Sequence, residues 1–63
     1  MPFDENKYIG LTSMGSQDMA TSDGYAWRVL AINGVAQVVT RDVRDDRVSV
    51  TIVDEVVVKA EIS

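Results

Sequence analysis

The fold of this chain is decided by residues 38–48, which read VVTRDVRDDRV. Val38, Val39 and Thr40 favour an extended backbone, and Val48 begins an alternating apolar pattern that is typical of a strand. Between these ends, three arginines and three aspartates lie within seven residues. Such a charged segment is too polar to be buried, and it leads directly into a strand. We therefore interpret it as an exposed loop that is held by its own ion pairs.

Two strands are predicted after this loop. Over residues 48–53, one face would carry Val48, Val50 and Ile52 and the other Ser49, Thr51 and Val53. Over residues 57–62, one face would carry Val58, Ala60 and Ile62 and the other Val57, Lys59 and Glu61. This alternation indicates two half-buried strands. Residues 54–55 (Asp-Glu) are the predicted turn between them. A two-residue turn needs positive φ and favours glycine, so a longer or bulged connection stays open. In this pattern Val53 and Val57 lie on the outer face of the sheet.

Thr12 is the best candidate for a helix cap, because its hydroxyl can accept from the first free backbone amides. A helix over residues 13–22 would then end at Asp23-Gly24, where glycine suits the left-handed conformation of a helix stop. The helix propensity of this segment is poor, since it contains Gly15, three serines and a threonine. Propensity alone therefore leaves helix and loop as near-equal alternatives.

Residues 25–32 read YAWRVLAI and predict a strand that is apolar on both faces. Such a strand belongs inside a sheet or beneath a partner. Trp27 can be a core residue or a ligand-stacking residue, and in a small domain the core is the better interpretation. Asn33-Gly34 is a strong turn signal. It would either reverse the chain, so that residues 35–39 pair back, or simply end the strand and open the loop.

These elements predict an α+β fold in a single small domain, because one helix is followed by strands and 11 of the 63 residues are valine. We expect one helix packed on a three- to four-stranded mixed sheet with a long exposed loop. In this interpretation residues 1–8 form a flexible N-terminal lead-in, and residues 9–63 form the domain.

The composition excludes several classes of protein. Cysteine and histidine are both absent, so disulfides, thiolate metal sites and any Ser-His or Cys-His catalytic pair are excluded. Ten acidic residues against six basic ones give a net charge of −4, which disfavours a nucleic-acid partner. No apolar run approaches the ~20 residues of a membrane span, and the N-terminus lacks the features of a secretory signal. As written, the chain is expected in the cytoplasm, or outside the cell if a signal was removed.

The clustered carboxylates of Asp42, Asp45 and Asp46 do not suggest catalysis. Three arginines alternate with them and should keep them ionised, which suits charge pairing rather than proton transfer. A domain of 63 residues also has little room for a substrate pocket. The same arginines would compete with calcium, and the ligand spacing of an EF-hand is missing. We expect neither an enzyme nor a cofactor or metal site.

Seven residues of the loop region follow a known pattern in order: Val39, Thr40, Asp42, Val43, Arg44, Arg47 and Val48. They resemble the reactive-site loop of the potato inhibitor I family, the eglin type of serine protease inhibitor, and its small bacterial relatives. Residues 10–12 (Gly-Leu-Thr) and 23–25 (Asp-Gly-Tyr) are similar to the borders of that family's single helix, which favours a helix between them. The resemblance implies that the strands flanking the loop run parallel and that the helix packs on one face of the sheet.

The resemblance further implies a serine peptidase inhibitor that presents a substrate-like loop. The protease-binding loop would consist of Val38, Val39, Thr40, Arg41, Asp42, Val43 and Arg44. Its reactive bond would be Arg41-Asp42. An arginine before that bond implies a trypsin-like target, with a subtilisin-like enzyme as the other candidate.

In this family, arginines of the strand behind the loop support the two sides of the reactive bond. Arg47 matches the one that would reach Thr40. Ser49 stands where the second arginine would reach Asp42, so Asp42 is expected to lack its partner because serine is too short. Arg44 is the candidate substitute for that missing support.

Three other interpretations stay open. The same scaffold can be an intracellular protein-binding or assembly module whose loop meets a partner other than a protease. The charged segment can also be a salt-bridged hairpin loop without a partner. Exposed valines at positions 53 and 57 would instead favour an oligomeric unit, so we expect a monomer with a dimer as the alternative. None of these interpretations involves nucleic acid or a membrane.

Overall fold

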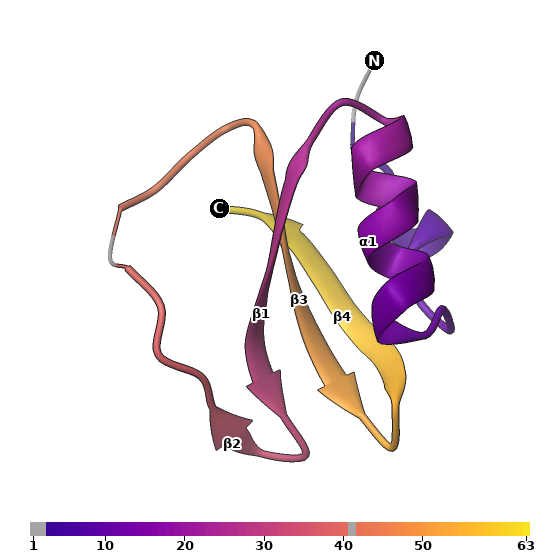
Figure 1. Ribbon diagram of the computed structural model, residues 1–63, viewed down its shortest axis with the longest axis vertical. Coiled ribbons are helices and arrows are strands. Elements are labelled where there is room, and N and C mark those ends of the chain that lie inside the picture. The colour runs from indigo at the N-terminus through magenta and orange to yellow at the C-terminus, as the bar shows by residue number, and fades with distance from the viewer. Residues whose placement is uncertain (1–2, 41) are drawn as a thin grey trace.

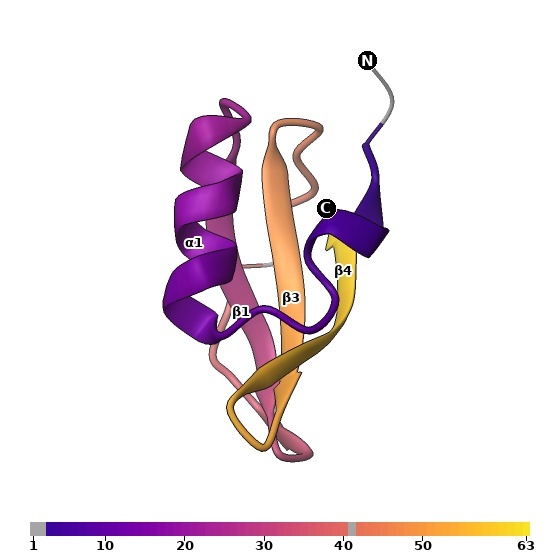
Figure 2. The same ribbon diagram turned by 90° about the vertical axis from the view of Figure 1, so that its right-hand side faces the viewer.

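The computed structural model describes residues 3–40 and 42–63 (Figure 1). Its elements, in chain order, are a short 3-10 helix η1 (Glu5–Lys7), the helix α1 (Ser13–Ser22) and the strands β1 (Ala26–Ile32), β2 (Val35–Ala36), β3 (Arg47–Val53) and β4 (Val56–Ile62). The strands form one four-stranded sheet in the order β2-β1-β3-β4. β1 and β3 run parallel, and the other two pairs are antiparallel. α1 packs on one face of this sheet, as Figure 2 shows from the side. The predicted α+β fold, with one helix on a mixed sheet, is confirmed.

α1 forms over the predicted range because both of its ends are stopped by suitable residues. Thr12 Oγ1 accepts from the Gly15 amide at 3.1 Å, and Gly24 follows the helix with a φ of +82°. Ser16 and Ala20 are buried, so tertiary packing compensates for the poor propensity of the segment. No helix in the part of the chain that the structure describes has the length and apolar character needed to cross a membrane.

Both hairpin turns use the left-handed backbone that tight turns require. Asn33 and Gly34 have φ values of 51° and 81°, and β2 then pairs back on the end of β1 before the chain leaves the sheet. The chain therefore first reverses and pairs back on β1, and then opens into the loop, so both of the outcomes predicted for this turn occur. Asp54 and Glu55 also have positive φ values, 51° and 69°, and form a two-residue turn, so the longer connection is wrong. The Asp54 amide donates to Asn33 Oδ1 at 2.7 Å, which ties the two turns together.

A bulge in β4 changes which valines face the core. Thr51 pairs with Lys59 and Ile52 pairs with Val57, so Val58 is an extra residue between them. The bulge turns Val57 inward, where it is fully buried, and leaves Val58 exposed. The prediction that Val57 lies on the outer face is therefore wrong.

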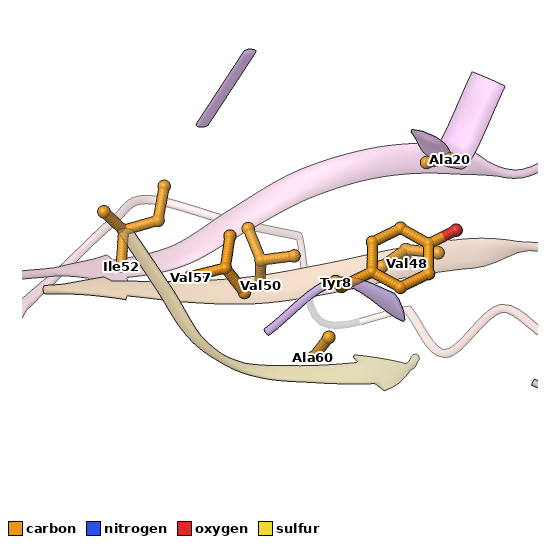
Figure 3. Close-up of a cluster of buried hydrophobic side chains, with 7 residues drawn as sticks. All are labelled: Tyr8, Ala20, Val48, Val50, Ile52, Val57 and Ala60. Carbon is orange, nitrogen blue, oxygen red and sulfur yellow. The ribbon is translucent and has the colours of Figure 1, made fainter. Parts of the chain in front are cut away.

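The hydrophobic core lies between α1 and the sheet (Figure 3). Its buried side chains are Tyr8, Ala20, Val48, Val50, Ile52, Val57 and Ala60. Val48, Val50 and Ile52 alternate along β3 as predicted, but Arg47 and Ser49 on the other face are buried as well, so the prediction of a half-buried strand is wrong there. Trp27 packs against this cluster from β1, and its Nε1 donates to Ser16 Oγ at 3.1 Å. The indole is therefore part of the core packing, with its polar group satisfied.

The predicted lead-in, residues 1–8, ends in the core. Tyr8 is fully buried, and its hydroxyl donates to Asp23 Oδ2 at 3.0 Å. Lys7 pairs with the same carboxylate at 2.9 Å. The hydrogen bonds from Lys7 and then from Tyr8 hold the pKa of Asp23 below its usual value, while burial raises the pKa of Tyr8. Flexibility of residues 1–8 stays a prediction, but Tyr8 itself packs with the domain.

Candidate functional site

The connecting loop, residues 37–46, joins β2 to β3 and swings away from the sheet beside β1 (Figure 1). The side chains of Val38 and Val43 are almost entirely exposed, and Val39 is partly exposed. Apolar side chains that a domain leaves in solvent on a projecting segment are candidates for contact with a partner. All the predicted protease-binding residues belong to this loop, and of these Arg41 lies outside the described residues.

Arg47 holds the returning arm of the loop, residues 42–46, which leads back to the sheet. Its Nη2 donates to the Asp42 carbonyl oxygen at 2.9 Å, and its Nη1 donates to the Asp42 carboxylate at 3.4 Å. Only 7% of Arg47 is exposed, so its guanidinium lies beneath the loop. The structure thus places Arg47 at Asp42 rather than at Thr40, the residue that the resemblance implied. The reason is its position at the start of β3, where the returning arm is the nearest part of the loop.

Arg28, a residue of β1, holds the outgoing arm of the loop, residues 37–40. Its Nη1 donates to the Thr40 carbonyl oxygen at 3.0 Å. Its Nε donates to Ser49 Oγ at 2.9 Å, and its Nη2 donates to the Ser63 carbonyl oxygen at 3.2 Å. Arg28 is not among the site residues predicted from the sequence. The signal that could have identified it is a single charge within the otherwise apolar segment 25–32.

Ser49 contributes to the loop support through Arg28. It is 1% exposed, and its Oγ accepts from Arg28 and from the Ser63 hydroxyl, each at 2.9 Å. The Ser63 carbonyl oxygen also accepts from Arg47 Nε at 3.0 Å, so both arginines lie against the end of β4. The prediction that Asp42 lacks a partner is wrong, because Arg47 occupies that place.

A hydrogen bond within the loop spans residue 41. The Thr40 hydroxyl donates to Asp42 Oδ1. This bond, followed by the nearby charge of Arg47, holds the pKa of the Asp42 carboxyl below its usual value. The carboxylate therefore stays ionised at neutral pH and accepts from both partners. Both sequence neighbours of Arg41 are fixed in this way, one on each side of the residue.

Arg44 and Asp46 form an exposed ion pair on the returning arm. Arg44 Nε and Nη2 each lie 2.9 Å from a different oxygen of Asp46. The pairing lowers the pKa of Asp46 and raises that of Arg44. Because its guanidinium is directed at Asp46, Arg44 does not take over the support of Asp42. The interpretation of the segment as a loop held by its own ion pairs is confirmed for the described residues.

Together these contacts tie Thr40 and Asp42 to the sheet, while the apolar side chains of Val38 and Val43 stay exposed. Within residues 3–40 and 42–63, the loop contains no residue with positive φ, and no group of three or more acidic side chains could hold a metal ion. Two guanidinium groups from two parallel strands hold the carbonyl oxygens before and after residue 41. A segment of this kind can enter the groove of a partner and pair with it as an added strand.

Comparisons of this chain with protein-family models, with curated proteins and with solved structures find no match. The resemblance to the potato inhibitor I family therefore rests on the residues of the chain itself. The function that the resemblance implies is accordingly a proposal, and the geometry of the loop provides the means to test it.

Proposed function

We propose that this chain is a serine peptidase inhibitor whose targets are trypsin-like enzymes. It would present residues 38–44 as a substrate-like loop, with Arg41-Asp42 as the reactive bond. The observation that carries the proposal is the pair of anchors on the two sides of residue 41. Each neighbour of that residue is held to the sheet by a guanidinium group through its carbonyl oxygen.

Fixing the loop before binding lowers the entropic cost of complex formation. Ordering one backbone residue costs about 1–2 kcal/mol, so a loop that is already held loses little freedom when it enters the cleft of a peptidase. The enzyme would bind the loop as an added strand and take one side chain into its main specificity pocket. The exposed side chains of Val39 and Val43 would then bury apolar surface that the free protein leaves in water.

The same anchors account for inhibition rather than rapid hydrolysis. When the bond after residue 41 is cut, one new end stays attached through Thr40 to Arg28. The other end stays attached through Asp42 to Arg47. Reacting groups that are held close together have a high effective concentration, so the two ends can re-form the bond before they separate.

Arginine at position 41 sets the target class in this proposal. A trypsin-like peptidase has an aspartate at the bottom of its main pocket. The charge-assisted pair between that aspartate and an arginine is strong because the pocket excludes water. Leucine at the same position would lose this pair and suit the apolar pockets of chymotrypsin-like and subtilisin-like enzymes.

The test is a titration of trypsin, chymotrypsin and subtilisin with the wild-type protein and with Arg41→Leu. We expect the wild type to inhibit trypsin most strongly, and Arg41→Leu to lose this preference and gain on the other two enzymes. Lys59→Ala is the matched control, because Lys59 is exposed on β4 and its loss removes the same charge outside the loop. If neither protein inhibits any of the three, the proposal is wrong, and a binding module with a non-protease partner becomes the better interpretation.

A further inference from the structure

We propose that Arg28, which lies against Ser49, is the positioning residue for the Thr40 side of the loop. It supplies from β1 the support that the resemblance assigned to Arg47, while Arg47 supplies the support of Asp42 that the resemblance assigned to an arginine at position 49. The inference rests on the proposed function, because it names the group that holds the loop immediately before the reactive bond. It departs from the pattern of the resemblance, in which both supports come from the strand behind the loop.

The sheet register makes it possible for a residue of β1 to replace a support from β3. Arg28 and Ser49 are paired residues of the parallel strands β1 and β3. Side chains of paired residues point to the same face, and their strands lie about 4.8 Å apart. An arginine on the neighbouring strand can therefore reach the same loop, provided that the residue it crosses is short. Serine meets this condition, and its Oγ accepts from Arg28 Nε at 2.9 Å.

Two acceptors outside the loop aim the guanidinium of Arg28. Nε is held by Ser49 Oγ, and Nη2 is held by the Ser63 carbonyl oxygen. A guanidinium is planar and its donors point in fixed directions. With two donors fixed, Nη1 is directed at the Thr40 carbonyl oxygen, 3.0 Å away. The three acceptors lie on three different residues, so this support depends on the fork geometry of arginine and not only on its charge.

The two arginines hold different arms of the loop. Arg28 holds the outgoing arm at Thr40, and Arg47 holds the returning arm at Asp42. Loss of Arg28 should therefore release the Thr40 carbonyl oxygen from β1 and leave Thr40 tied through its hydroxyl to Asp42, whose contact with Arg47 stays in place. A residue that merely stabilised the domain would instead loosen the loop and the core together.

The first measurement needs no peptidase. The proteins are the wild type, Arg28→Ala, Arg28→Lys and the control Lys59→Ala, and the readout is the amide order parameter from NMR relaxation. We expect the order parameter of Thr40 to fall from near the rigid value of about 0.85 to below about 0.6 in both Arg28 variants. The amides of Val48 and Val50 should keep their wild-type values, which also shows that the variants are folded.

The second measurement is the rate at which saturating trypsin cuts the chain after Arg41, with the site of cleavage read by mass spectrometry. Loss of a hydrogen bond from a charged group corresponds to a factor of roughly ten or more in rate. We expect Arg28→Ala and Arg28→Lys to be cut at least about tenfold faster than the wild type, and Lys59→Ala to be cut at the wild-type rate. Lysine keeps the charge but not the fork, so it should not rescue the loop.

An exchange of the two residues tests the replacement directly. Ser49→Arg alone places a second guanidinium against Arg28 and should speed cleavage. Arg28→Ser combined with Ser49→Arg moves the arginine of this pair from β1 to β3, where Arg47 already lies, and should return the cleavage rate to the wild-type range. A double variant that is cut as fast as Arg28→Ser alone would overturn the replacement.

The two readouts separate the failure of this inference from that of the proposed function. If the wild type inhibits no peptidase but Thr40 loses order in both Arg28 variants, the proposed function fails and Arg28 remains the anchor of the loop. If Thr40 stays ordered in Arg28→Ala, or if Arg28→Lys behaves as the wild type, Arg28 is not a positioning residue, whatever the inhibition.

Discussion

The two faces of β3 are held in different ways. On one face Val48, Val50 and Ile52 pack against the helix side of the core. On the other face Arg47 and Ser49 lie beneath the connecting loop and are held by hydrogen bonds. All five residues are 7% exposed or less, so burial alone does not distinguish the faces. The two faces differ in the interactions of their buried residues, which are apolar packing on one face and hydrogen bonds on the other.

Apolar packing and hydrogen bonding constrain a chain differently. The hydrophobic effect has no preferred direction and scales with the area removed from water. Hydrogen bonds from a guanidinium are directional, and each contributes roughly 1.5–3 kcal/mol. The apolar face of β3 should therefore set the stability of the whole domain, and the polar face should set the conformation of the loop. Variants that alter one face at a time can break this separation.

The largest effect is expected from Ile52→Ala. Removing a buried isoleucine side chain costs about 2–5 kcal/mol, which is a large share of the about 5–15 kcal/mol that stabilises a typical domain. A domain of this size loses about 4–8 °C in melting temperature for each kcal/mol. Thermal unfolding measures the change, with Val53→Ala as the exposed control in the same strand. Equal melting temperatures for the two variants would contradict the role given to the apolar face.

Arg47→Ala should act mainly on the loop. The variant loses the contacts to Asp42, so trypsin should cut after Arg41 about tenfold faster or more. Its melting temperature should fall by less than that of Ile52→Ala, because the apolar core is unchanged. Cleavage rate, mass spectrometry of the fragments and thermal unfolding are measured on the same samples. Cleavage mainly after Arg44 would show that the reactive bond is misplaced.

Features that depend on neighbours along the chain could be predicted from the sequence. The ends of the helix over residues 13–22 follow from a capping threonine and from Asp-Gly, whereas the poor propensity between them left helix and loop as near-equal alternatives that only the resemblance separated. The strand β3 and its inward-facing Val48, Val50 and Ile52 follow from the alternation of apolar and polar residues, but the burial of Arg47 and Ser49 on its other face does not. The loop itself follows from a charged segment that cannot be buried, so the predicted site and the observed loop occupy the same part of the chain.

Features that depend on pairing between distant residues could not be predicted. The contact between Arg28 and Ser49 joins residues 21 positions apart, and it exists only in one register of β1 against β3. No local pattern fixes that register. The inward position of Val57 likewise depends on the extra residue Val58 in β4, which reverses the alternation beyond it. In both cases the pairing with the neighbouring strand, and not the local pattern, decided which face or contact resulted.

A smaller effect on the melting temperature is expected from Gly15→Ala at the start of α1, the helix that covers the apolar face. Alanine is favoured over glycine in a helix by about 0.5–1 kcal/mol. A Cβ on Gly15, however, would lie 3.1 Å from Thr12 Oγ1, the oxygen that caps the helix. Displacing the cap costs about as much as the alanine contributes. We therefore expect Gly15→Ala to leave the melting temperature nearly unchanged.

The cap explanation is tested by removing the hydroxyl. In a Thr12→Ala background the close contact to Thr12 Oγ1 is absent, so Gly15→Ala should raise the melting temperature by the full helix preference, about 2–8 °C. Thermal unfolding of the four proteins in this cycle gives the coupling between the two positions. The same shift in both backgrounds would show that the cap and residue 15 do not compete.

The smallest effect concerns the pH dependence of the loop. Asp42 has a pKa below its usual value of about 3.9, first because the Thr40 hydroxyl donates to it and then because Arg47 lies close. A carboxyl with a lowered pKa in the folded state stabilises that state above its ordinary pKa and loses the contribution as the pH falls through the lowered pKa. Loop order should therefore stay constant from neutral pH down to about pH 5 and decrease below about pH 4. The effect is small because about half of the Asp42 side chain, 52%, is exposed to solvent.

NMR relaxation at Thr40 between pH 7 and pH 3 measures this change, with the core amide of Val50 as the internal reference. Asp42→Asn can still accept from Thr40 but does not titrate, so the decrease in order should disappear in that variant. Asp46 also has a lowered pKa, through Arg44, and titrates in the same range. Asp46→Asn is therefore the control and should keep the decrease. If Asp46→Asn abolished the decrease and Asp42→Asn did not, the acid-sensitive contact would be the exposed ion pair of the returning arm instead of the bond that spans residue 41.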